Sequence, residues 1–208
     1  MATMPKVEFH FDFGSPNAYF AHAIIPAIEK RTGATFNYVP VLLGGVFKLT
    51  NNQAPMVQFK DVKNKLEYQR LETRRFIKRH GLKRFKMNPH FPVNTVQIMR
   101  GAVAAEMDGT FAAYVDAVFR HMWEDGRKMD DPEIIRAALD ASGLDGRRTL
   151  QRIQEQAVKD RLLNNTEESV ARGTFGSPTF FVGEEMFFGK DRLGDVEEEI
   201  QAAKAAGR

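Results

Sequence analysis

The chain begins with a strict alternation of apolar and polar residues. Positions 7, 9, 11 and 13 are apolar, and the positions between them are polar, which is the period of a half-buried β-strand. Gly14 ends this pattern, and a helical pattern then runs to about Arg31, with Ser15 fitting an N-cap and Pro16 the first helical turn. The segment 35–43 again has strand character. Two strands around one helix predict a βαβ unit with parallel pairing.

The middle of the chain has an almost entirely helical pattern. A segment rich in Gly, Asn and Pro, 44–55, predicts a loop before it. Start and stop signals then divide the pattern into five helices. These are expected at about 57–80, from 94 or 95 to 109, 110–125, 131–142 and 147–172.

Strand character returns near the end of the chain. Residues 179–182 and 186–188 flank a Glu-Glu turn and predict a β-hairpin, and a last helix is expected from about Asp191. The predicted fold class is therefore α/β, a βαβ…ββα domain with a large all-helical insertion. We expect residues 1–55 and 173–208 to form one discontinuous domain, with 56–172 as the insertion.

The amino-acid composition limits which kinds of site and partner the chain can have. The chain has 208 residues, of which 43% are hydrophobic and 27% charged, as in ordinary globular proteins. The net charge of +3 gives no reason to expect a nucleic-acid partner. The absence of cysteine excludes disulfides, thiolate metal ligands and a nucleophilic thiol carried by the protein, and we expect no metal site. Because no signal-peptide pattern or membrane-length apolar run occurs, we expect a cytoplasmic protein.

Three motifs in a fixed order resemble one family. The stretches FDFGSPNAYFA, NPHFPVNT and FFGKDRL together resemble 2-hydroxychromene-2-carboxylate isomerases, whose near relatives are the kappa-class glutathione transferases. The resemblance spans about residues 7–200. It implies a thioredoxin-like fold of the bacterial disulfide-oxidase branch, in which Ser15 and Ala18 stand where that fold carries its two cysteines. Pro178 would then be the cis-proline that faces the first helix.

The resemblance also implies an activity. It points to glutathione-dependent isomerisation of 2-hydroxychromene-2-carboxylate to trans-o-hydroxybenzylidenepyruvate, an aromatic keto acid, in aromatic hydrocarbon catabolism. Glutathione is the expected cofactor, and a homodimer is expected. One rival is a kappa-type glutathione transferase or peroxidase with the same thiol site. The other is a redox-inactive binding protein that kept the fold after losing both cysteines.

Ser15 is the expected catalytic residue. Only a minor fraction of a free thiol with a pKa of about 8.5 is ionised at neutral pH. A serine hydroxyl can donate a hydrogen bond to a thiolate, and a helix N-terminus adds partial positive charge. Ser15 supplies the hydroxyl and also lies at the expected helix N-terminus. The competing interpretation makes Ser15 an N-cap alone.

The expected contacts with glutathione come from four further places. Ser177 and Pro178 would present backbone groups to its cysteinyl part, as a strand edge does. Lys190 and Asp191 offer charges complementary to its γ-glutamyl carboxylate and amine, although the family usually has a small polar residue where Lys190 stands.

Two further contacts each have two candidate residues. Asn52 resembles an asparagine that contacts glutathione in the family, and Asn51 is the alternative. Lys63 is the preferred lysine, and Lys65 is its rival.

The remaining assignments concern the substrate side and the core. Phe91, Pro92 and Asn94 would line the substrate pocket, or else form a helix cap with a hydrophobic staple. His10 and Asp12 share one face of the first strand, where a structural hydrogen-bonding role is favoured over catalysis. The aromatic residues Phe119 and Trp123 are expected in the core.

Overall fold

A four-stranded mixed sheet forms the centre of the computed structural model, which describes residues 5–207. The strands are β1 (Val7–Phe11), β2 (Phe36–Pro40), β3 (Thr179–Val182) and β4 (Glu185–Phe188), in the spatial order β2-β1-β3-β4. β1 pairs parallel with β2 and antiparallel with β3, which pairs antiparallel with β4. The predicted βαβ…ββα order is confirmed.

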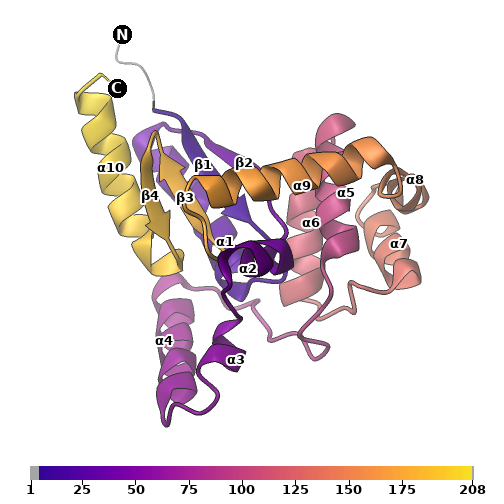
Figure 1. Ribbon diagram of the computed structural model, residues 1–208, viewed down its shortest axis with the longest axis horizontal. Coiled ribbons are helices and arrows are strands. Elements are labelled where there is room, and N and C mark those ends of the chain that lie inside the picture. The colour runs from indigo at the N-terminus through magenta and orange to yellow at the C-terminus, as the bar shows by residue number, and fades with distance from the viewer. Residues whose placement is uncertain (1–4, 208) are drawn as a thin grey trace.

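Helices account for the rest of the architecture (Figure 1). They are α1 (Pro16–Thr32), α2 (Leu43–Thr50), α3 (Pro55–Gln58), α4 (Lys65–His80), α5 (Val96–Met107), α6 (Phe111–Trp123), α7 (Pro132–Asp140), α8 (Gly146–Arg152), α9 (Gln156–Ala171) and α10 (Leu193–Ala205), with a 3-10 turn, η1 (Lys190–Arg192), before α10. Figure 1 shows α5 to α8 grouped to one side of the sheet, whereas α9 and α2 cross in front of it.

The alternation in β1 sets the two faces of the sheet. Phe9 and Phe11 contact Tyr38 on one face, where Tyr38 also meets His22 of α1. His10 points to the other face and hydrogen-bonds Ser169 of α9. Because both faces are covered by helices, all five residues of β1 are buried.

Three element predictions were wrong. The expected loop 44–55 contains α2, because the apolar side chains recur at helical spacing and α2 packs on α9 despite its two glycines. The helix expected over 57–80 is two helices, separated where Asn64 adopts a left-handed backbone conformation with φ 67°. The helix expected over 147–172 divides into α8 and α9, and the turn between them buries Ile153.

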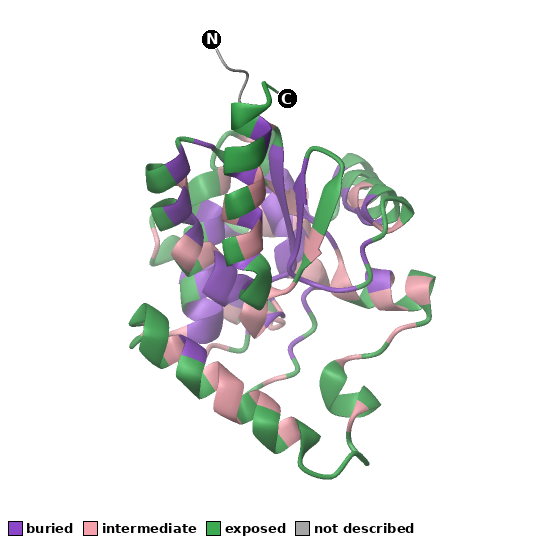
Figure 2. Cartoon of the chain, turned by 90° about the vertical axis from the view of Figure 1, so that its left-hand side faces the viewer, coloured by how far each residue is buried: buried purple, intermediate pink, exposed green. Residues whose placement is uncertain are grey.

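The hydrophobic core is continuous from the sheet into the helical block. Phe13, two residues after β1, contacts Phe119 of α6 edge to face, and the indole of Trp123 donates to the Phe13 carbonyl. Both α6 side chains are buried, as expected. In contrast, α3 buries none of its residues, and Figure 2 shows the α3–α4 region standing away from the body with much exposed surface.

The proposed domain boundaries at 55 and 172 remain a prediction. Although α9 falls within the expected insertion, it packs on β2 and α2. Within residues 5–207, no helix combines the length and apolar character needed to cross a bilayer.

Candidate active site

Ser15 and Ser177 come together where the first strand gives way to the first helix. Ser15 is the N-cap of α1, and its hydroxyl accepts from the Ala18 amide at 3.3 Å. The same hydroxyl donates to the Ser177 carbonyl at 2.8 Å. The Ser177–Pro178 peptide bond is cis, as predicted. The two serines, 162 residues apart in the sequence, are 5% and 9% exposed.

Asp12 forms hydrogen bonds with both serines of this junction and with three neighbouring segments. Its amide donates to the Ser177 hydroxyl at 3.1 Å, and its carbonyl accepts from the Ser15 amide at 3.0 Å. Its carboxylate accepts from the amides of Gly14 and Leu43 and from the Thr95 hydroxyl, at 2.8, 2.8 and 3.0 Å. Burial raises the pKa of the Asp12 carboxyl, against the opposing effect of these three hydrogen bonds. Asp12 therefore has the structural role that was favoured from the sequence.

Two backbone amides at the junction have no acceptor within residues 5–207. They belong to Ser177, just before the cis-proline, and to Asn17 in the first turn of α1. Pro16 has no N–H, so Asn17 supplies the first donor of this helix end. An unpaired strand-like amide beside a helix N-terminus suits a ligand that combines an extended peptide with an anionic group.

Asn52 reaches the same loop as Ser177. Its side-chain amide donates to the Phe175 carbonyl at 2.8 Å, and its side-chain oxygen accepts from the Gln53 amide. Asn51 is instead the C-cap of α2, in a left-handed conformation. Lys63 is exposed in the turn before α4, and the Lys65 ammonium lies over the Phe59 ring. The structure thus brings Asn52 to the junction and leaves both lysines on the surface.

Lys190 and Asp191 pair with each other. The Lys190 ammonium lies 2.8 Å from both carboxylate oxygens of Asp191 and 4.6 Å from the centre of the Phe76 ring of α4. The Lys190 side chain is only 7% exposed, whereas that of Asp191 is 72% exposed. η1, which carries both residues, packs against α1. The exposed member of the pair is therefore Asp191.

The loop proposed to line the substrate pocket contacts the core at one residue. The ring of Phe91 packs 5.9 Å from that of Trp123, and the Phe91–Pro92 bond is cis. Pro92 and Asn94 are exposed, and the Asn94 side chain accepts from the Val96 amide. Asn94 therefore makes the helix-capping type of contact that was the alternative interpretation. Its role toward a substrate stays a prediction.

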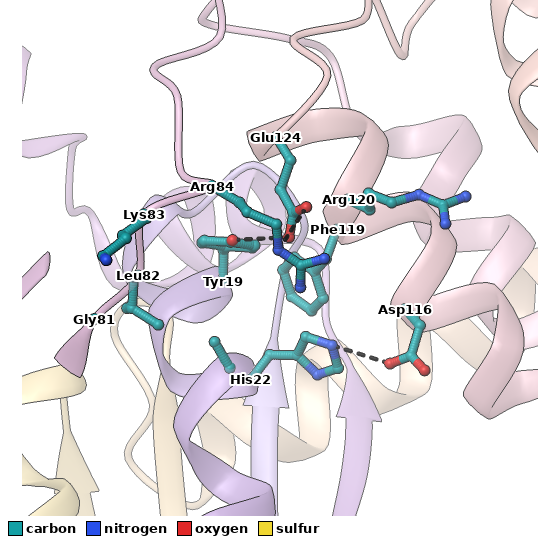
Figure 3. A pocket seen from close by; sticks show the side chains of 11 residues that line it. Tyr19, His22, Gly81, Leu82, Lys83, Arg84, Asp116, Phe119, Arg120 and Glu124 are labelled. Atoms are coloured by element: carbon teal, nitrogen blue, oxygen red, sulfur yellow. Dashed lines mark hydrogen bonds and ion pairs between the residues drawn. The ribbon is translucent and has the colours of Figure 1, made fainter.

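A separate hollow of about 490 Å³ lies between α1, α6 and the turn after α4 (Figure 3). Its polar side chains are largely paired. Tyr19 donates to Glu124, and His22 lies 3.1 Å from Asp116. Neither Ser15 nor Ser177 lines it. The hollow therefore lies outside the serine junction.

Sequence reasoning missed Thr95 and Phe76. Thr95 holds the Asp12 carboxylate, and Phe76 covers the Lys190 ammonium. Thr95, the N-cap of α5, is 83 residues from Asp12, and Phe76 of α4 is likewise distant in sequence from Lys190. Their patterns signal only a helix start and a buried helix face, so no local signal identifies these contacts.

Comparisons with known proteins agree with this architecture. Residues 6–201 match the DSBA-like thioredoxin domain family. A 2-hydroxychromene-2-carboxylate isomerase from Pseudomonas putida is 29% identical over 189 residues, 90% of each chain. A kappa 1 glutathione S-transferase from Rattus norvegicus is 24% identical over 204 residues, covering 93% of this chain and 90% of the relative.

A solved structure is similar over nearly the same range. It is that of a 2-hydroxychromene-2-carboxylate isomerase, with a TM-score of 0.78 and 28% identity over 94% of both chains. The resemblance inferred from the three motifs is thereby confirmed. Because the family match covers nearly all of the chain, the protein belongs to the DSBA-like thioredoxin domain family.

Proposed function

We propose that the protein is a glutathione-dependent isomerase that converts 2-hydroxychromene-2-carboxylate to trans-o-hydroxybenzylidenepyruvate. The observation that carries the proposal is the junction of Ser15 and Ser177 at the N-terminus of α1, in a chain without cysteine. The names of the relatives support an isomerase. When bound, glutathione would supply the thiolate that adds to the conjugated double bond, permits rotation and then leaves.

Ser15 would stabilise the charged sulfur. Its hydroxyl has one proton, which it donates to the Ser177 carbonyl in this structure. Turning that proton toward a thiolate frees the carbonyl to accept an N–H from the ligand. The unpaired Ser177 amide can donate in the opposite direction. Rotation of the Ser15 hydroxyl would thus break its hydrogen bond to the Ser177 carbonyl. The carbonyl and the amide of Ser177 could then both pair with the ligand backbone, as in a β-strand.

Other residues would hold the ends of the ligand. Asp191 is exposed and carries the charge that a γ-glutamyl ammonium requires, whereas the buried Lys190 ammonium is bonded to Asp191 and would position that carboxylate. Asn52 is already anchored to Phe175 in the loop before Ser177. Lys63 is free to approach an anion but has no contact that assigns it to the site.

Substrate would approach from the loop that carries Phe91, Pro92 and Asn94. The apolar ring of Phe91 and the exposed Pro92 suit an aromatic acid, and Asn94 offers a polar amide. The unpaired backbone amide of Asn17, in the first turn of α1, would donate a hydrogen bond to the negative charge that develops on the substrate during addition.

The direct test is turnover of the chromene acid, followed by absorbance, with and without glutathione. We expect no isomerisation by dialysed protein and full activity after millimolar glutathione is added. S-methylglutathione is the control, because it keeps the peptide and lacks the thiol. Full-rate isomerisation without any thiol would refute the proposal. Glutathione binding without turnover would favour a redox-inactive binding protein.

The kappa-type transferase is the second candidate, because kappa relatives align over 93% of this chain. Mass spectrometry of the reaction separates the two functions. An isomerase releases a product of unchanged mass and regenerates glutathione, whereas a transferase consumes glutathione and accumulates an adduct. Reduction of a peroxide with formation of oxidised glutathione would indicate the peroxidase variant.

A further inference from the structure

A serine, a histidine and an aspartate meet at the end of α6, away from the Ser15 junction. His121 Nδ1 lies 2.7 Å from a carboxylate oxygen of Asp125, and His121 Nε2 lies 2.9 Å from the Ser142 hydroxyl. His121 belongs to the last turn of α6, and Asp125 follows that helix. Ser142 comes from the turn after α7. These residues share no hydrogen bond with Ser15 or Ser177.

The hydrogen bonds fix one tautomer of His121. The Asp125 carboxylate accepts, so the proton of a neutral imidazole lies on Nδ1. Nε2 is then an acceptor. The guanidinium of Arg120, which can only donate, lies 3.4 Å from Nε2 and agrees with that assignment. The one partner of Nε2 that carries a mobile proton is the Ser142 hydroxyl. This is the order of contacts that activates a serine in hydrolases.

The environment favours a neutral histidine. His121 is buried at 3% exposure, and this burial lowers the pKa of its imidazole. The hydrogen bond to Asp125 opposes that shift, while the charges of Arg127 and Arg120 reinforce it. Asp125 has a side chain 40% exposed, and Ser142 is half-buried. The base is therefore shielded, while the serine and the carboxylate reach the surface.

Arg120 adds the group that a negatively charged intermediate needs. Its guanidinium nitrogen lies 2.8 Å from the Ser142 hydroxyl, and the side chain is otherwise exposed. A cation at that distance stabilises an alkoxide or an adjacent oxyanion.

A structural role competes with the nucleophilic one at Ser142. Its hydroxyl lies 2.9 Å from the Ala138 carbonyl, four residues earlier, as a helix-terminal serine commonly does. One proton cannot serve both Ala138 and His121 at once. A purely structural serine would give its proton to the carbonyl and show no unusual reactivity, whereas an activated one reacts through His121. Reactivity toward an electrophile therefore decides between the two roles.

We propose that Ser142, His121 and Asp125 form a second nucleophilic site that hydrolyses small, activated carboxylic esters. The Ser142 oxygen would attack the ester carbonyl carbon as its proton passes to His121 Nε2. The carbonyl oxygen takes the displaced electron pair beside Arg120. The C–O bond to the leaving alcohol then breaks, and that alcohol takes the proton from His121. Water, deprotonated by His121, releases the carboxylic acid and restores the serine.

The test is covalent labelling with a fluorophosphonate, in which the serine oxygen displaces fluoride from phosphorus. The chain contains four serines, at 15, 142, 169 and 177, so peptide mapping assigns the label without ambiguity. We expect the label on Ser142. We also expect Ser142→Ala to abolish it and to lower p-nitrophenyl acetate hydrolysis about a hundredfold, the effect of losing base-assisted attack.

Two further variants keep the test independent of folding. Asp125 is surface-accessible, so Asp125→Asn should remain folded by circular dichroism and still lose most labelling, because the amide no longer orients His121. Ser169→Ala is the matched control: Ser169 also bonds a histidine, but that pair has no carboxylate and the serine is fully buried. Equal labelling of wild type and Ser142→Ala, or unchanged labelling of Asp125→Asn, would overturn the proposal.

Discussion

The buried His10 should make the stability of the protein depend on pH. His10 is 3% exposed on the face of β1 that meets α9, where Nδ1 bonds the Ser169 hydroxyl and Nε2 has no partner among the described residues. Burial lowers the pKa of His10 from 6.5 to about 4; Glu8 opposes this shift, whereas Arg172 and Lys6 add to it. The native state therefore holds His10 neutral in a pH range where the unfolded chain binds a proton.

The sign and size of the effect follow from proton linkage. Between pH 6.5 and pH 4, the unfolded state carries the extra proton, so the free energy of unfolding falls as the pH falls. The whole shift corresponds to about 3 kcal/mol. At pH 5 the loss relative to pH 7.5 should be about 2 kcal/mol, and above pH 7 the contribution of His10 should be constant.

Urea unfolding at pH 7.5 and pH 5.0 measures this loss, with the fluorescence of the buried Trp123 as the probe. His10→Gln keeps a polar partner for Ser169 but cannot titrate. It should lower the stability at pH 7.5 and show a drop toward pH 5.0 that is about 2 kcal/mol smaller than that of the wild type. The matched control is His90→Gln at an exposed position. Parallel pH profiles for wild type and His10→Gln would refute the reasoning, as would an NMR titration of His10 near pH 6.5.

Three further outcomes are expected. Ser15→Ala should lower turnover ten- to a hundredfold, roughly the loss of one charge-assisted hydrogen bond, and raise the pH at which thiolate absorbance near 240 nm appears in the complex; unchanged values would make Ser15 a helix cap only. Gly101→Ala should destabilise the fold by about 1–3 kcal/mol in thermal unfolding, because its Cβ would lie 2.0 Å from the Tyr114 hydroxyl, whereas Gly194→Ala meets no atom within 4 Å and should be neutral or stabilising. Light scattering should give about twice the 23.6 kDa chain mass if the expected homodimer forms, and a monomer would remove that expectation.

Local patterns were sufficient for the sheet and for both ends of α1, α5, α6 and α7. Alternation in β1, the Ser15–Pro16 start of α1 and the hairpin near the C-terminus are short-range signals, and the structure confirms each. The same kind of signal failed at α2. Its two glycines favour a loop, but packing against α9 supplies stabilisation that local propensity does not contain.

The candidate site also contains features that were expected from the sequence and features that only the structure reveals. Ser15, Ser177 and the cis bond before Pro178 were expected from the family resemblance that the three motifs carry, and the structure places the two serines in contact beside that cis bond. The pairing of Lys190 with Asp191 was not predictable in this way. From the sequence, two opposite charges beside each other are equally consistent with separate contacts to a ligand, and only the packing of Phe76 over the ammonium turns Lys190 inward.

By itself, the sequence determined the order of elements, the loss of thiol chemistry in the chain and the family. The tertiary structure decided which distant residues meet: Asp12 with Thr95, Asn52 with the Phe175 carbonyl, and His121 with Ser142. The physical reason is that hydrophobic periodicity and capping are encoded within a few residues. In contrast, a hydrogen bond between separate elements depends on how helices pack on the sheet, which is a property of the whole core.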